Sequence, residues 1–358
     1  MKRVLLCLAA TLSLAACLDS PAAPGKREPT PPDPPMGTNP VSAAQASTTC
    51  KGRCLVRLGT IGHFHYASLN EHAELLAGGH RWSKATGLVR NGGDGWRTIN
   101  SWHRLISGTF ELRPVVWENG RIKSRISLPD MRFGEATSIN DWGRVVGHYR
   151  TNSDMHTRAF RWSPYSGGTV LPSLERHGSS AEDINHSDDA VGYSVPADGV
   201  RKAVLWPRAG GIRELGTLPG YVGSMAMAIS NKGAVAVVSW KEEVERGMPE
   251  MRAAVWTPDG GLRNLGTLGG NFSEAHDVNH WGEVVGASTT RTLPATPGFD
   301  GQVHAFTWHP TTGMVRLDAG GATQSRALAI NSWGDVVGIL NDNELVAWVW
   351  EQNLHRWR

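Results

Sequence analysis

The sequence predicts an all-β fold, a β-propeller of seven blades with four antiparallel strands each. Three observations lead to this prediction. One short pattern recurs seven times from about residue 67 to the end, glycine is abundant at 42 of 358 residues, and the segments between turn signals are short and rich in Val and Trp. Short strands joined by tight turns have this composition, and a recurring pattern marks a repeat architecture.

Residues 1–16 are predicted to be a lipoprotein signal peptide. Lys2 and Arg3 precede short apolar runs that end at Cys17, and a charged start before a short apolar stretch is typical of a secretion signal. The segment Leu14-Ala15-Ala16-Cys17 resembles a bacterial lipobox, which implies that Cys17 is lipidated and becomes the first residue of the mature protein. An ordinary signal peptide cleaved nearby is the alternative.

Residues 17–49 are predicted to form a lipid-anchored tether rich in Pro, Ala and Ser. Five prolines between residues 29 and 35 disfavour helix and strand pairing, so the segment is expected to be a semi-rigid spacer. Similarity to Gram-negative lipoproteins implies an outer-membrane anchor, because Leu18 rather than an aspartate follows Cys17. The membrane is therefore a predicted partner, and the domain would face the periplasm or the cell surface.

Cys50 and Cys54 lie where the tether meets the predicted propeller, residues 50–358. In an oxidising compartment they are expected to form a small-loop disulfide. Metal binding is the alternative, although no second Cys pair accompanies these two thiols. The formal net charge of +3 falls to +1 when Lys2 and Arg3 are removed, so no nucleic-acid partner is indicated.

Each repeat begins with a strand, a four-residue turn and a second strand, as in ATSINDWGRVVGH at 136–148. Asn and Gly are favoured at the first and fourth positions of a type I turn, and the Asn side chain can bond its own backbone. Asp188 fills the glycine position of one copy, so a positive φ is expected there. The turn residues are Asn70, Asn100, Asn140, Asn185, Ser230, Asn279 and Asn331.

A third strand, as in AFRW at 159–162, carries a tryptophan that is expected to wedge between neighbouring sheets and to donate its indole N–H to a neighbouring carbonyl. A fourth strand is clearest at 211–220 and 261–270. Such sheets bury both faces when stacked radially. Residues 55–62 match the fourth-strand pattern and are predicted to close the ring, unless residues 354–357 do so. The third-strand tryptophans are assigned as Trp82, Trp117, Trp162, Trp206, Trp256, Trp308 and Trp350.

The repeat resembles the HAF-repeat family of bacterial extracellular proteins, through His304-Ala305-Phe306 and the motifs IN-x-x-G-x-VVG, AF-x-W and LGTLGG. The resemblance covers about residues 55–358. It implies an extracellular repeat protein, and it implies no activity, because family members generally have none assigned.

Four further tryptophans precede the turn glycine and would all lie on one face of the disc. Flat aromatic rings beside polar neighbours such as Asp141 and His280 suit sugar binding, and the alternative is that each ring folds back over the adjacent sheet. These candidate ligand-binding residues are Trp102, Trp142, Trp281 and Trp333.

Longer links between second and third strands are expected on the opposite face, and one of them, 241–251, carries Glu242, Glu243, Glu245 and Glu250. This loop could bind a cation, but a solvated charged loop is the commoner interpretation. His276 and His280 are separated by a strand and a turn, which argues against a helical metal site. No catalytic, cofactor or metal motif is found in the sequence, although carboxylates around a central channel would escape a repeat alignment.

Three hypotheses follow. The leading one is a non-catalytic binding lipoprotein with a glycan or protein ligand. The alternatives are a carbohydrate-active propeller enzyme, either glycosidase or lyase, and a structural scaffold of an envelope assembly. Fold alone does not choose among them.

Overall fold

The computed structural model describes residues 45–46, 53–60, 67–77, 80–90, 96–99, 105–107, 114–118, 121–153, 156–175, 178–241, 250–291, 303–341 and 343–357. The chain divides into two units, residues 1–39 and 40–358, and every described residue belongs to the second.

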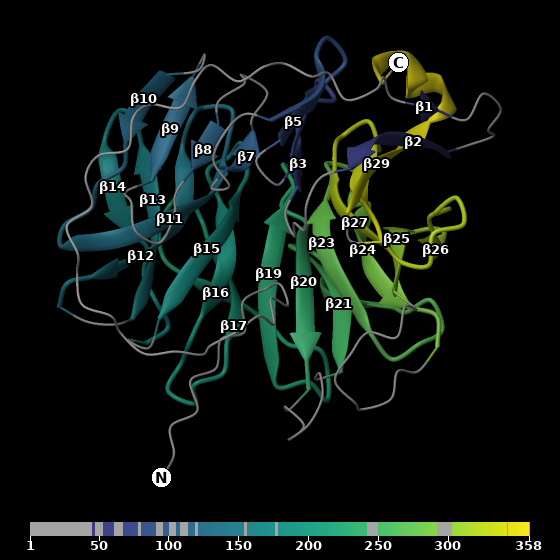
Figure 1. The fold of residues 1–358 in the computed structure, drawn as a ribbon. Coiled ribbons are helices and arrows are strands. Elements are labelled where there is room, and N and C mark those ends of the chain that lie inside the picture. The colour runs from purple at the N-terminus through teal and green to yellow at the C-terminus, as the bar shows by residue number, and fades with distance from the viewer. Residues whose placement is uncertain are drawn as a thin grey trace, which may run out of the picture. The chain divides into compact units, whose positions relative to one another are not determined.

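The described strands form seven antiparallel sheets, six of four strands and one of five (Figure 1). The first sheet in chain order contains β3 (Ala67–Leu69), β4 (Leu75–Ala77), β5 (His80–Ser83) and β6 (Gly87–Arg90). The second contains β7 (Trp96–Ile99), β8 (Leu105–Ser107), β9 (Val115–Glu118) and β10 (Arg121–Arg125). The third contains β11 (Met131–Ile139), β12 (Val145–Thr151), β13 (Thr157–Ser163) and β14 (Gly167–Val170).

The fourth sheet contains β15 (Ser179–Ile184), β16 (Ala190–Ser194), β17 (Lys202–Trp206) and β18 (Arg213–Gly216). The fifth contains β19 (Gly223–Ile229), β20 (Val235–Trp240), β21 (Met251–Thr257) and β22 (Gly261–Gly266). The sixth contains β23 (Ser273–Val278), β24 (Val284–Thr289), β25 (Val303–His309) and β26 (Gly313–Arg316). The seventh sheet joins β27 (Ser325–Ile330), β28 (Val336–Leu340) and β29 (Glu344–Trp350) to β2 (Arg53–Thr60) and β1 (Gln45–Ala46).

The first strands of successive sheets contact one another in a closed cycle, in which β27 of the last sheet contacts β3 of the first. This arrangement is a β-propeller. Strand β2 pairs with β29, so the N-terminal segment completes the seventh sheet, as the sequence predicted. The alternative closure by residues 354–357 is wrong, because a 3₁₀ helix, η1 (Glu351–Arg356), occupies that region.

One expectation about the tether is also wrong. Residues 17–49 were expected to contain no paired strand, but β1 pairs with β2 and makes the seventh sheet five-stranded. The proline cluster ends at Pro40, so the backbone at Gln45 and Ala46 keeps its N–H groups for pairing.

The third-strand tryptophans pack between sheets, as expected. Trp206 is fully buried among Val146 and Ala159 of the preceding sheet. Its indole N–H donates to the carbonyl of Pro172 at 2.7 Å. From the fourth strand of the preceding sheet, Arg263 covers the ring of Trp308 at 5.0 Å. The tryptophans therefore join each sheet to the one before it.

In the last sheet the assigned third-strand tryptophan was wrong. Trp348 pairs with Val336, just as Trp308 pairs with Val284 in the sixth sheet. Trp348 is buried, and its indole N–H reaches the carbonyl of Asp318 at 2.5 Å. Trp350 lies two residues further on and is 37% exposed. The segment AWVW offered two candidates, and only the strand register distinguishes them.

The Asn turns have the predicted geometry. Gly143 N–H donates to the carbonyl of Asn140 at 2.9 Å, and the side-chain oxygen of Asn140 accepts from the N–H of Trp142 and of Arg144. Asp188 has φ 68°, as expected of a residue in the glycine position. Ala73 occupies the same position of the first sheet with φ 59°.

The turn asparagines have a second role that the sequence did not reveal. The side-chain amide of Asn140 donates to the carbonyl of Asn185 in the next sheet at 3.0 Å. Asn185 and Asn279 make equivalent bonds to the turns that follow them. Each of these three turns thereby holds the next one in place.

Buried serines at the start of several first strands form another inter-sheet link. Ser273 has no exposed surface, accepts from Ala253 N–H at 3.0 Å and donates to the carbonyl of Gly266 at 2.7 Å. Ser179, Ser224 and Ser325 accept from the equivalent alanines of their preceding sheets. These bonds satisfy backbone groups that would otherwise be buried without partners.

Candidate functional site

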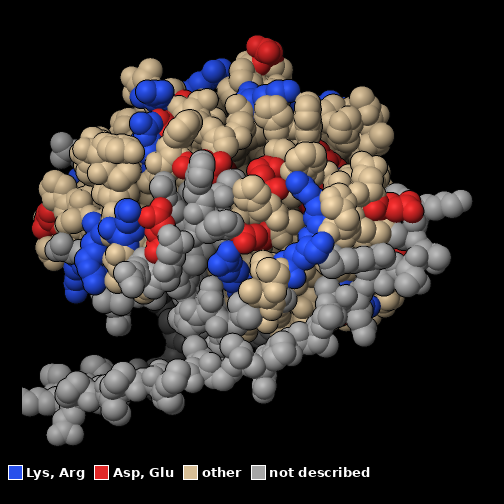
Figure 2. Space-filling view, turned by 90° about the horizontal axis from the view of Figure 1, so that it is seen from above, with Lys and Arg blue, Asp and Glu red and all other residues tan. Residues whose placement is uncertain are grey.

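The face that carries the Asn turns, which we call the turn face, presents three of the four predicted tryptophans. Trp142, Trp281 and Trp333 are 64%, 62% and 53% exposed, and Trp102 lies outside the described residues. The turn face is the upper side of Figure 1, where the first strands end, and it is viewed from above in Figure 2. Acidic and basic side chains are interspersed there with other residues (Figure 2).

Each of two rings is tethered and still exposed. Trp142 donates its indole N–H to the carbonyl of His186 at 3.1 Å, and Trp281 donates to the carbonyl of Ser332 at 2.9 Å. The rings therefore lean toward the next sheet, as the alternative interpretation required, but more than half of each remains accessible. An aromatic surface held in a fixed orientation is suited to stacking against a flat apolar ligand surface.

Polar side chains lie beside Trp142. The carboxylate of Asp141 is 3.0 Å from Nε2 of His186, and Nδ1 of His186 is 3.2 Å from the side-chain amide of Asn231. The hydrogen bond with Asp141 raises the pKa of His186, against the lowering effect of desolvation. These three residues follow the turn asparagine or serine in three consecutive sheets.

The same turn position in the seventh and first sheets carries Ser332 and Glu71. The backbone N–H and the hydroxyl of Ser332 both donate to the Glu71 carboxylate, the hydroxyl at 2.9 Å. The charge of Glu71 also raises the pKa of His186, although the two belong to sheets that are not neighbours. At this turn position, Asp141, His186 and Asn231 are thus linked by direct contacts, and Glu71 and Ser332 by hydrogen bonds.

Two of the three rings carry cations. Nζ of Lys232 lies 4.7 Å from the ring centroid of Trp281, and Cζ of Arg356 lies 4.1 Å from that of Trp333. Arg356 comes from η1, which is fixed by Trp357 stacking on Trp82 at 4.7 Å.

Two aspartates on inner strands have raised pKa values. Desolvation raises the pKa of Asp183, and it raises that of Asp277 to about 7, with the charge of Asp183 adding to the effect. Each carboxylate accepts two backbone N–H bonds, and for Asp277 these come from Val278 at 2.7 Å and Ile330 at 2.8 Å. The second bond joins Asp277 to the next sheet, so it holds the inner strands together.

An ion-paired group lies on the same strand as Asp277. Glu274 contacts His276 at 3.1 Å and Arg326 at 2.7 Å. Desolvation alone would raise the pKa of Glu274, but the two cationic partners lower it to about 2. His276 also bonds the carbonyl of Ala327 at 2.6 Å, whereas His280 lies in the turn, so the two histidines are not brought together as a site.

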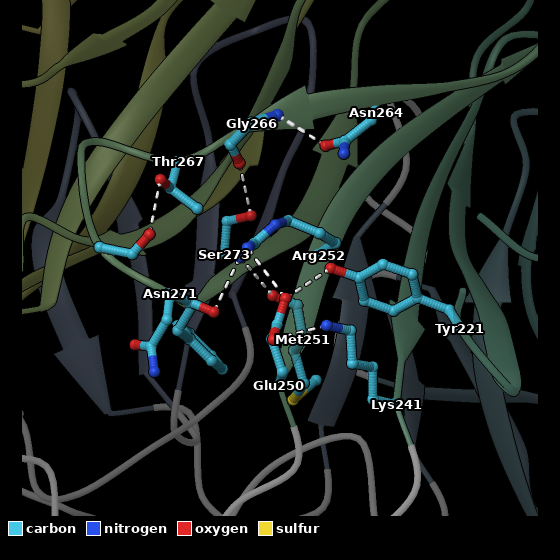
Figure 3. A network of polar contacts seen from close by, with 12 residues as sticks. Tyr221, Lys241, Glu250, Met251, Arg252, Asn264, Gly266, Thr267, Asn271 and Ser273 are labelled. Carbon is cyan, nitrogen blue, oxygen red and sulfur yellow. Dashed lines mark hydrogen bonds and ion pairs between the residues drawn. The ribbon is translucent and has the colours of Figure 1, made fainter. Parts of the chain in front are cut away.

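The acidic link on the opposite face is anchored by a polar network (Figure 3). Glu250 accepts from Tyr221 at 2.8 Å, Lys241 at 2.9 Å and Arg252 at 3.0 Å. The hydrogen bond from Lys241 contributes most to lowering the pKa of Glu250. Desolvation raises the pKa of Tyr221 to about 12. The Glu250 carboxylate is therefore occupied by hydrogen bonds from its neighbours. Glu242, Glu243 and Glu245 lie outside the described residues.

The predicted modification sites fall mostly outside the described residues. This is true of Cys17 and Cys50, whereas Cys54 is buried and disulfide-bonded. Within the described ranges, no group of three or more His, Cys, Asp or Glu residues could hold a metal ion. No described helix has the length and apolar character needed to cross a membrane.

The histidine of His304-Ala305-Phe306 occupies a position that other sheets use for a cation. Lys202 and Arg252 stand there and donate to the carbonyls of Val222 at 2.7 Å and Asn271 at 2.8 Å. His304 is buried, its Nδ1 has no hydrogen-bond partner, and desolvation lowers its pKa. Sequence comparison of the copies could have shown this exchange of Lys or Arg for His.

No protein-family model matches the chain, and a comparison with curated proteins finds no similar sequence. Solved structures do match. An oligogalacturonate lyase in complex with manganese is 11% identical with a TM-score of 0.54, over 88% of this chain and 98% of that one. A catalytically inactive virginiamycin B lyase from Staphylococcus aureus, with quinupristin, is 9% identical with a TM-score of 0.53, over 86% and 98%. At these identities the likeness shows the fold alone.

Proposed function

We propose that this β-propeller is a non-catalytic glycan-binding module whose binding surface is the turn face. The observation that carries the proposal is the exposure of Trp142, Trp281 and Trp333, at 64%, 62% and 53%, on one face of the molecule. Monomeric proteins seldom expose several large aromatic rings on one face without a partner. The indole bonds of Trp142 and Trp281 hold their rings in place before a ligand arrives, which lowers the entropic cost of binding.

The polar neighbours support a sugar over an apolar partner. Asp141, His186 and Asn231 lie beside Trp142 and offer hydrogen-bond donors and acceptors at the edge of an aromatic surface. Sugar rings present an apolar face together with hydroxyl groups, so they match this combination. A protein partner would be expected to cover a wider area.

The test is retention of the full chain on a panel of insoluble polysaccharides that includes peptidoglycan, with reducing-sugar release measured in the same tubes. The matched variant replaces Trp142, Trp281 and Trp333 by alanine. Retention that is lost in the folded triple variant supports the proposal. Equal retention of the wild type and the triple variant contradicts the proposal. Failure of both proteins to be retained also contradicts it.

The proposal includes the architecture and the cellular setting. The seven sheets are seven blades of one ring, the repeat belongs to the HAF-repeat family, and Cys17 is lipidated, so that the tether holds the propeller at the outer membrane. The lipobox at residues 14–17, the proline-rich segment and the repeat motifs support this setting. Metabolic labelling with a fatty acid, lost on Cys17→Ser, tests the anchor. Unchanged labelling would contradict it.

A carbohydrate-active enzyme is the second candidate. It is favoured by Asp277, whose pKa of about 7 would allow it to donate a proton at neutral pH. Both oxygens of Asp277 are occupied by backbone N–H groups, which favours a role in joining strands. Product release in the retention assay, abolished by Asp277→Ala, would move this candidate to first place.

A further inference from the structure

We propose that the turn face selects acidic glycans, with two tryptophans that stack on sugars and two neighbouring cations that bind their carboxylates. The inference rests on the proposed glycan-binding function and specifies its ligand class. The four residues are Lys232, Trp281, Trp333 and Arg356, which we call the Trp–cation stripe. They come from the fifth sheet, the sixth sheet, the seventh sheet and η1.

The two tryptophans of the stripe are adjacent. Trp281 bonds the carbonyl of Ser332, the residue that precedes Trp333, at 2.9 Å. Each ring has a cation over one of its faces, at 4.7 Å for Lys232 and 4.1 Å for Arg356. In the order of the sheets, the two rings therefore lie between the two positive charges.

Neither cation has a carboxylate partner among the described residues. Lys232 is exposed, and its ring contact with Trp281 is the sole interaction that the described structure gives it. Arg356 is half-buried and stacks on Trp333. A guanidinium binds a carboxylate through paired N–H donors.

The acidic side chains near the stripe are already engaged. Glu71 accepts bonds from Ser332, and Glu283 pairs with Arg53 at 2.5 Å and accepts from the hydroxyl of Thr307. The stripe thus keeps two positive charges that pair with no described carboxylate, next to two exposed rings. A uronic acid residue carries the complementary features, a sugar ring and a carboxylate.

The test uses affinity electrophoresis of the full chain in gels containing polygalacturonate or alginate. Methyl-esterified polygalacturonate and dextran serve as uncharged counterparts, and dextran sulfate serves as a non-carboxylate polyanion. The variants are Lys232→Gln, Arg356→Gln and their combination. Arg208→Gln is the matched control, because Arg208 is a 70% exposed cation that lies 3.9 Å from Asp188 and is not part of the stripe. Thermal unfolding checks that each variant is folded. Among the described contacts, Lys232→Gln removes only the one between Lys232 and the Trp281 ring.

We expect retardation by at least one acidic polymer and none by its uncharged counterpart. The double variant should bind at least tenfold more weakly, whereas Arg208→Gln should stay within twofold of the wild type. Equal binding of charged and esterified polymer, lost in the triple tryptophan variant, would overturn the inference and leave the proposed function standing. Equal retardation by dextran sulfate, an equal loss in Arg208→Gln, or no binding to either acidic polymer would also overturn it. Absence of binding to every polysaccharide would count against the proposed function itself.

Discussion

Trp281 and Ser332 are joined across two sheets by a hydrogen bond of 2.9 Å from the indole N–H to the backbone carbonyl. Trp142 and His186 repeat the relationship at 3.1 Å between two other sheets. Trp206 and Trp348 in third strands also bond a neighbouring carbonyl, but they are buried while these rings are exposed. The same residue type thus serves the core in one position of the repeat and the surface in another.

This relationship makes Trp281→Phe an informative change. Phenylalanine keeps an aromatic surface but loses the bond to Ser332. Because the site is largely exposed, we expect a loss of about 0.5–1 kcal/mol in the free energy of unfolding, measured with urea. Glycan retention should weaken less than in Trp281→Ala. If both variants bind equally poorly, the bond and not the ring surface determines binding.

The turn geometry predicts different effects at two equivalent positions. Gly282 has φ 79°, and a Cβ there would meet no atom within 4 Å, so Gly282→Ala adds backbone strain alone. We expect it to destabilise the fold by about 1 kcal/mol. Ala73→Gly, at φ 59°, relieves such strain but removes a methyl group that is buried in the core, so we expect the two effects to offset to within about 1 kcal/mol. Urea unfolding measures both variants, and a larger loss in Ala73→Gly than in Gly282→Ala would contradict the shared turn conformation.

The buried serines are expected to contribute more than exposed ones. Ser273→Ala would leave the N–H of Ala253 and the carbonyl of Gly266 without their partner in the core. We expect a loss of about 1–3 kcal/mol in unfolding free energy. Ser187→Ala, at an exposed turn position, is the control and should change it by less than about 0.5 kcal/mol. Similar effects of the two changes would refute the inter-sheet role of Ser273.

Asp277 should make stability depend on pH. Its pKa rises from 3.8 to about 7 on folding, so between these values the folded state binds the proton more tightly than the unfolded state. Stability therefore falls as pH rises through that window. Asp277→Ala loses two backbone contacts, so it should be less stable than the wild type at pH 5, with the difference narrowing by pH 8.

Two other groups bear on this experiment. His186, with its raised pKa, also loses stabilisation as pH rises, and both proteins retain it. Glu274 acts in the opposite sense, because folding lowers its pKa from 4.5 to about 2 and its contribution is lost as pH falls between these two values. The difference between wild type and Asp277→Ala, measured by urea unfolding from pH 5 to pH 8, therefore reports Asp277 together with its electrostatic coupling to Asp183. A difference that does not change with pH would contradict the assignment.

Local pattern was sufficient to predict the strands and the Asn turns, because these depend on residues near one another in sequence. The closure by residues 55–62 followed from their match to the fourth-strand pattern, although they pair with β29 at the other end of the chain. Asp188 could even be assigned its positive φ in advance. The contacts between sheets could not be predicted. The bond from Asn140 to Asn185, the serine links, and Lys232 beside Trp281 join residues about 20 to 50 positions apart, and their geometry depends on how the sheets stack. The choice between Trp348 and Trp350 depended on register in the same way.

The most direct test of a glycan-binding turn face is a two-dimensional NMR spectrum of the tryptophan indole N–H groups, recorded while soluble fragments of a retained polysaccharide are added. The account predicts that the signals of Trp142, Trp281 and Trp333, assigned through single substitutions, shift in a saturable manner while those of buried Trp206 and Trp348 stay in place. Shifts confined to other signals, with the three exposed tryptophans unchanged at saturation, would contradict it.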